Sequence, residues 1–65
     1  MAKLHGFKHG QRVRSTQHGT TGTVRVFELS DAERAEGCAA GEVQWDGSIV
    51  ADELDADTAR TLRAI

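Results

Sequence analysis

The sequence predicts an all-β fold, a small barrel of four or five antiparallel strands with one short helical insertion. Residues 10–26, GQRVRSTQHGTTGTVRV, predict two strands joined by a glycine-containing turn, and residues 43–50, VQWDGSIV, predict a second hairpin. β-branched and aromatic residues favour strands, and glycines between them favour turns. Because 65 residues suffice for one small domain, we expect one unit over residues 1–65, with an N-terminal arm at 1–9 and an inserted helical loop at 30–41.

Composition narrows the class of protein. Apolar residues make up 38% and charged residues 28%, which is typical of a folded domain, and no apolar run approaches the ~20 residues of a membrane helix. The first ten residues lack the apolar core of a signal peptide. The single cysteine, Cys38, excludes an internal disulfide. We therefore expect a cytoplasmic protein that does not contact a membrane.

The first predicted strand covers residues 11–15. Its alternation directs Val13 inward and Arg12 and Arg14 outward, since successive strand side chains face opposite sides of a sheet. A turn over residues 17–22 follows, in which Gly19 and Gly22 either adopt positive φ or allow close backbone approach. Ahead of this strand, Phe7 is expected to seal one end of the barrel.

The second predicted strand covers residues 23–29 and has the strongest strand composition. Val24 and Val26 share one face, and the other face carries Thr23, Arg25 and Phe27. Phe27 and Leu29 are out of phase with the valines. This predicts either a bulge or a second apolar patch on the outer face.

A short helix is predicted at residues 31–36. Ser30 and Glu33 have the spacing of a capping box, in which each side chain bonds the backbone of the other. Gly37 stands where a glycine commonly ends a helix.

A hairpin is predicted over residues 42–51 because Asp46-Gly47 favours a two-residue turn. The resulting register has three opposed pairs: Trp45 with Ser48, Gln44 with Ile49, and Val43 with Val50. Opposed residues share a face of the sheet. The core face would then hold Val43, Trp45 and Val50, while Gln44 and Ile49 would point outward.

Two structures fit residues 52–65. A helix capped by Asp55 or Asp57 could run to Ala64, with Leu62 and Ile65 on one stripe. Alternatively, residues 55–59 form one helical turn and residues 62–65 form a final strand beside residues 11–15. We favour the second structure, because small barrels usually close their free edges.

Charge is unevenly distributed. Residues 1–27 contain five basic residues and no acidic one, whereas residues 28–65 contain ten acidic and three basic residues. Such asymmetry is typical of a nucleic-acid-binding face opposite an acidic face. The alternative is that the two halves interleave in the sheet and neutralise each other across strands.

Two segments resemble known small barrels. Residues 10–13 followed by Gly19, Gly22 and Val24 resemble the KOW motif of SH3-like barrels, and residues 43–47 resemble a strand and turn of Tudor-like domains. The resemblance covers residues 10–26 and 43–50. It implies an SH3-like barrel that binds RNA or associates with the transcription or translation machinery.

The sequence contains no pattern typical of an enzyme, a metal site or a cofactor site. The soft metal ligands are His5, His9, His18 and Cys38. His5 and His9 have the spacing of a ligand pair on a helix, but Gly6 and Gly10 disfavour a helix there. No sequence feature places a base beside Cys38, and the acidic run at residues 52–57 lacks the pattern of a calcium loop. We expect a non-catalytic protein without metal or cofactor. An aromatic cage is not expected either, because the predicted faces separate Phe27 from Trp45.

Two binding surfaces are candidates. The first is a basic stripe for nucleic acid or its machinery, formed by Lys8, Arg12, Arg14, His18 and Arg25. The second would bind a protein or a second copy of the chain. It would use the acidic C-terminal half, or an outer apolar patch of Phe27, Leu29 and Ile49. The sequence leaves the oligomeric state open.

Overall fold

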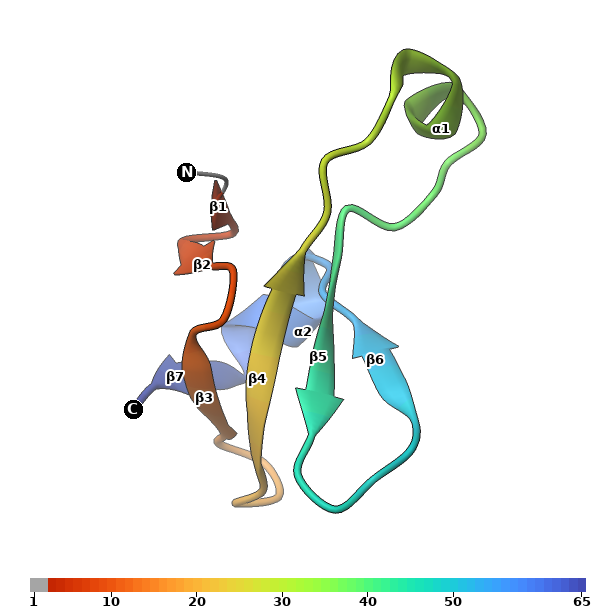
Figure 1. Cartoon of the computed structure of the whole chain (residues 1–65). Coiled ribbons are helices and arrows are strands. Elements are labelled where there is room, and N and C mark those ends of the chain that lie inside the picture. The colour runs from red at the N-terminus through yellow and green to blue at the C-terminus, as the bar shows by residue number, and fades with distance from the viewer. Residues whose placement is uncertain (1–2) are drawn as a thin grey trace.

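The computed structural model describes residues 3–65, so residues 1 and 2 of the predicted arm lie outside the described residues. The chain is mostly β-structure, with two short helices (Figure 1). Its elements in order are β1 (Lys3–Leu4), β2 (Phe7–Lys8), β3 (Arg12–Ser15), β4 (Thr21–Val26), α1 (Asp31–Ala35), β5 (Gly41–Trp45), β6 (Ala51–Glu53), α2 (Ala56–Arg60) and β7 (Leu62–Ala64).

The main sheet has five antiparallel strands in the order β6-β5-β4-β3-β7. The sheet is open, because β6 and β7 lie at its two edges and do not pair with each other. The prediction of antiparallel β-structure is confirmed, whereas closure into a barrel is not seen. Strands β1 and β2 form a separate small hairpin where the sequence predicted only an arm.

The C-terminal segment has the second of its two predicted structures. The Asp55 carboxylate accepts the Thr58 N–H at 2.7 Å and caps α2, which ends at Arg60. The chain then pairs β7 with β3, so that Leu62 lies opposite Ser15. The alternative of a helix running to Ala64 is wrong.

Strand β3 follows the predicted alternation, with Val13 fully buried between the exposed Arg12 and Arg14. Strand β4 begins two residues earlier than predicted and ends at Val26. The two glycines of the predicted turn have different functions. Gly19 has a positive φ of 72°, whereas Gly22 lies within β4 and allows β5 to approach closely.

The core lies on one face of the sheet. Its buried apolar side chains are Val13, Val24, Val43, Leu54 and Leu62. Ala59 of α2 packs against this cluster, and α2 lies behind the sheet in Figure 1. Phe7 and Leu4 of the N-terminal hairpin also pack against the cluster, but the sheet is open, so the barrel end that Phe7 was predicted to seal is not seen.

The β5–β6 hairpin is wider than predicted. Val43 pairs with Asp52 instead of Val50, a shift of two residues. Val43 lies on the core face, as predicted. Val50 is 63% exposed, so the prediction that it belongs to the core is wrong. Ile49 is fully exposed.

The turn conformation explains this shift. The favoured two-residue hairpin turn of type I′ needs positive φ at both central residues. Gly47 has a φ of 75°, but Asp46 does not have a positive φ. The Ser48 N–H still bonds the Trp45 carbonyl at 3.2 Å, so a turn forms at the predicted place while residues 46–50 stay outside the sheet.

The segment between β4 and β5, residues 27–40, stands away from the sheet (Figure 1). It is called the arm below and is distinct from the N-terminal arm predicted at residues 1–9. Helix α1 lies at its tip, with the predicted capping box between Ser30 and Glu33, and it buries no residue. Gly37 ends the helix with a φ of 78°, as predicted. The arm continues the β4–β5 pairing at its base, where the Phe27 N–H bonds the Ala40 carbonyl at 2.8 Å.

Candidate nucleic-acid interface

Four arginines share the outer face of the sheet, opposite the core. The register places Arg12 opposite Thr23 and Arg14 opposite Arg63, so these side chains and Arg25 occupy one side of strands β7, β3 and β4. All four arginines are exposed. The other half of this face is acidic, because β5 and β6 contribute the directly opposed pair Glu42 and Glu53.

Arg12 is held by Asp46, which lies 34 residues further along the chain. Its two guanidinium nitrogens donate to the two carboxylate oxygens of Asp46, and Nη1 also donates to Thr23 Oγ1 at 2.8 Å. Thr21 Oγ1 donates to the same carboxylate at 2.7 Å. The hydrogen bonds from Arg12 and from Thr21 hold the pKa of Asp46 well below its usual range, and the bond to Asp46 raises the pKa of Arg12. Arg12 therefore ties β3 to the β5–β6 hairpin.

Asp46 makes stability sensitive to acid. The pKa of Asp46 in the folded state lies below its unfolded value of about 3.9. Its contribution to the free energy of unfolding is therefore complete above that pH and is lost as the pH falls through the folded-state pKa. We expect Asp46→Asn to lower the urea midpoint at about pH 7 and to reduce the drop in midpoint between pH 7 and about pH 3. A matched Glu28→Gln variant should keep the wild-type drop. An equal drop in D46N and wild type would contradict this role of Asp46.

The other three arginines of the face form no ion pair within 4.0 Å in residues 3–65; they are Arg14, Arg25 and Arg63. The Arg25 guanidinium lies 6.0 Å from the centre of the Phe27 ring, which is half-buried at the end of the face. Arg63 Nη1 donates to the carbonyls of Leu62 and Arg60, at 2.9 and 3.4 Å. Arg14 and Arg63 therefore keep their positive charge available to a ligand, whereas Arg25 lies directly opposite Glu42 of β5 without forming an ion pair within 4.0 Å.

The remaining predicted basic residues lie elsewhere. Lys8 belongs to the small hairpin, opposite Lys3. His18 lies in the β3–β4 turn, beside a groove of about 310 Å³ that Trp45, Asp52 and Asp57 also line. Arg63 was absent from the predicted set. Arg63 could have been predicted from the expected final strand. If Leu62 is buried in a strand beside β3, the next residue lies on the face that carries the arginines.

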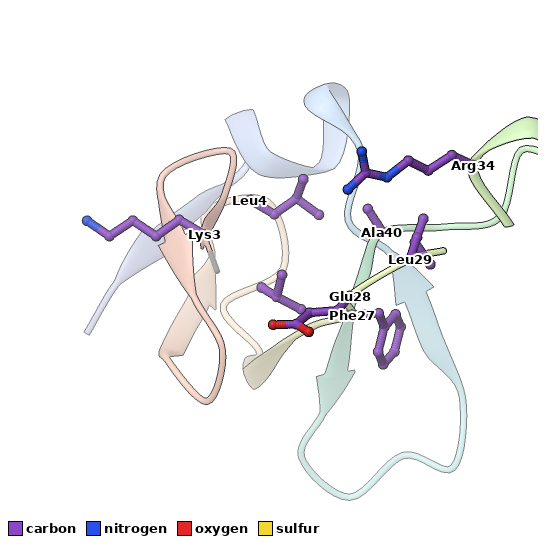
Figure 2. A pocket seen from close by; sticks show the side chains of 8 residues that line it. Lys3, Leu4, Phe27, Glu28, Leu29, Arg34 and Ala40 are labelled. Carbon is purple, nitrogen blue, oxygen red and sulfur yellow. The ribbon is translucent and has the colours of Figure 1, made fainter. Parts of the chain in front are cut away.

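The predicted apolar patch is divided between two ends of the sheet. Phe27 and Leu29 line a groove of about 670 Å³ at the base of the arm (Figure 2). Ile49 lies in the loop between β5 and β6, beyond the opposite end of β5 (Figure 1). The structure therefore does not bring Ile49 together with the other two residues.

In the part of the chain that the structure describes, the histidines and acids do not assemble a metal site. Within residues 3–65, no group of three or more His, Cys, Asp or Glu side chains is placed to hold a metal ion. His9 Nδ1 instead accepts the Val26 N–H at 3.0 Å, which ties the segment after β2 to the end of β4. Neither helix of this part of the chain is long and apolar enough to cross a membrane.

Comparison with known proteins yields no match among protein-family models, curated proteins or solved structures.

Proposed function

We propose that the protein is a non-catalytic nucleic-acid-binding module of the SH3-like, KOW/Tudor type. The five-stranded antiparallel sheet, with a helical turn before its last strand, supports this type of barrel in an open form. The outer face of β7, β3 and β4 contacts the phosphates. Arg14, Arg25 and Arg63 make these contacts, and Arg12 borders them while it keeps its bond to Asp46.

The observation that carries this proposal is the direct opposition of Arg14 and Arg63 on neighbouring strands. Like charges that face each other across an antiparallel pair destabilise the sheet. Neither charge has an acidic partner within 4.0 Å in residues 3–65. A polyanion placed over the two strands would neutralise both charges and release its own counterions, which is the main source of affinity in nucleic-acid binding.

Phe27 favours a single-stranded ligand. Its half-buried ring lies beside Arg25 at the end of the basic face, so a base could stack there while the arginines hold the backbone. Aromatic rings next to a basic surface bind single strands with little sequence preference. We infer that the module binds single-stranded RNA or DNA more tightly than duplex.

Fluorescence anisotropy with labelled oligouridine, oligothymidine and duplex DNA tests the proposal. The triple variant Arg14→Ala, Arg25→Ala, Arg63→Ala should lose at least about tenfold in affinity, and its salt slope should fall by about 0.7 per lost contact with single strands. Arg60→Ala is the matched control, since Arg60 lies on α2 and pairs with Asp57 at 3.4 Å. It should bind within about twofold of wild type. Equal binding by the triple variant and wild type would refute the assigned face.

A further inference from the structure

The groove at the base of the arm has apolar walls and basic rims. Leu4 of β1 forms one wall, and Leu29 and Ala40 of the arm form the other (Figure 2). Leu4 packs directly over Gly41, where an added Cβ would lie 2.7 Å from Leu4 Cδ2, so the small hairpin is held against the sheet. At about 670 Å³ the groove has the size of a typical binding cleft.

Lys3 and Arg34 stand on opposite sides of this groove (Figure 2). Neither side chain forms an ion pair within the described part of the chain. Glu28 is the acidic residue of the lining, so the groove carries a net positive charge. A segment that binds in this groove should therefore have apolar side chains with acidic residues next to them in the sequence.

The loop between β5 and β6 has these properties. Ile49 is fully exposed and Val50 is 63% exposed, and two acidic residues, Asp52 and Glu53, follow in β6. Isolated exposed apolar residues are common, but here two large ones are adjacent in a defined loop.

Hydrogen bonds give this loop a fixed shape. Gln44 Nε2 donates to the Ser48 carbonyl at 2.6 Å, and Ser48 Oγ accepts the Val50 N–H at 3.1 Å. A loop that is already ordered loses less conformational entropy when it binds. It is therefore suited to enter a groove without rearrangement.

The groove and the loop lie at opposite ends of β5 (Figure 1). A copy of the chain therefore cannot place its own loop in its own groove. We propose that the protein self-associates head to tail, with Ile49 and Val50 of one copy seated between Leu4 and Leu29 of the next. Contacts between two different surfaces form a closed ring when the rotation between copies closes and an open chain when it does not, and the arrangement proposed is the open chain.

The charges favour this arrangement over binding of an unrelated apolar segment. Lys3 and Arg34 of one copy lie near the start of β6 in the next, where Glu53 supplies the unpaired carboxylate. Asp52 lies on the other face of β6 and accepts the Trp45 Nε1–H at 2.6 Å. Opposite potentials across a contact accelerate association and align the partners. The contact is small, so we expect a dissociation constant on the order of 100 µM that increases with salt.

Sedimentation velocity from about 10 µM to 1 mM protein, without nucleic acid, tests the proposal. The wild-type average mass should increase with concentration beyond that of a dimer. Ile49→Asp and Leu29→Asp should each remain monomeric across this range. Ile65→Asp is the matched control, because Ile65 is 67% exposed and belongs to neither surface, and it should associate like wild type.

Mixing the two variants gives a sharper test. Ile49→Asp keeps an intact groove and Leu29→Asp keeps an intact loop, so an equimolar mixture should form dimers and nothing larger. Arg34→Glu is a second groove variant that leaves the core unchanged, since α1 buries no residue, and it should weaken association at least about fivefold. A monomeric wild type at 1 mM, self-association by Ile49→Asp, a wild-type mass that stops at two copies, or a mixture that stays monomeric would each overturn the proposal. None of these variants alters Arg14, Arg25 or Arg63, so this result is independent of the nucleic-acid measurement.

Discussion

Replacing Leu62 with alanine is expected to remove most of the stability of the fold. Leu62 is 1% exposed and belongs to a core of only five buried apolar side chains in residues 3–65. Truncating a buried leucine costs about 2–5 kcal/mol, because its burial is lost and a cavity remains. A chain of 65 residues has a total stability of roughly 3–10 kcal/mol, so the loss approaches the whole free energy of unfolding.

Urea denaturation followed by tryptophan fluorescence measures this effect, since Trp45 packs against the core. Ile65→Ala is the matched control in the same C-terminal segment. Ile65 is 67% exposed, so this variant should change the free energy of unfolding by less than about 0.5 kcal/mol. If Leu62→Ala and Ile65→Ala had equal midpoints, β7 would not pack as described.

Gly22→Ala is expected to produce the second large loss of stability. A Cβ at this position would lie 2.8 Å from the Gln44 carbonyl oxygen and 2.9 Å from Trp45 Cε3. The first of these atoms belongs to the backbone of β5, so the strands themselves would have to separate. Overpacking of this kind costs about 1–3 kcal/mol.

The same denaturation experiment gives the magnitude, and amide hydrogen exchange gives the location. Exchange should accelerate first in β5, which pairs with β4 through Gly22 and Trp45. Thr20→Ala is a suitable control, because Thr20 is exposed and precedes β4, and it should change stability by less than about 0.5 kcal/mol. Wild-type stability in Gly22→Ala would show that β4 and β5 are not in such close contact.

Local patterns predicted much of the fold. The capping box at Ser30 and Glu33 is present, and the alternation around Val13 places its neighbouring arginines outward. These features depend on residues a few positions apart, and local hydrogen bonding and the two-residue period of a strand determine them. The turn at Gly47 was also predicted correctly, but its effect on the strand register was not.

The candidate site was predicted in part. Arg12, Arg14 and Arg25 share the face that strand alternation assigned to them. The bond between Arg12 and Asp46 joins residues 34 positions apart, and no local pattern indicates it. Arg63 joins the face only because β7 pairs with β3.

The sequence by itself determined which residues favour strands, where the chain turns, how α1 begins and which side chains of β3 face inward. Each of these depends on the backbone preferences of neighbouring residues. Tertiary structure decided the rest: the open sheet, the two-residue shift of β6, and the separation of Ile49 from Phe27 and Leu29. These outcomes depend on which strands meet across the sheet and on how Asp46 is bound by Arg12 and Thr21, and contacts between distant residues are set only when the whole chain packs.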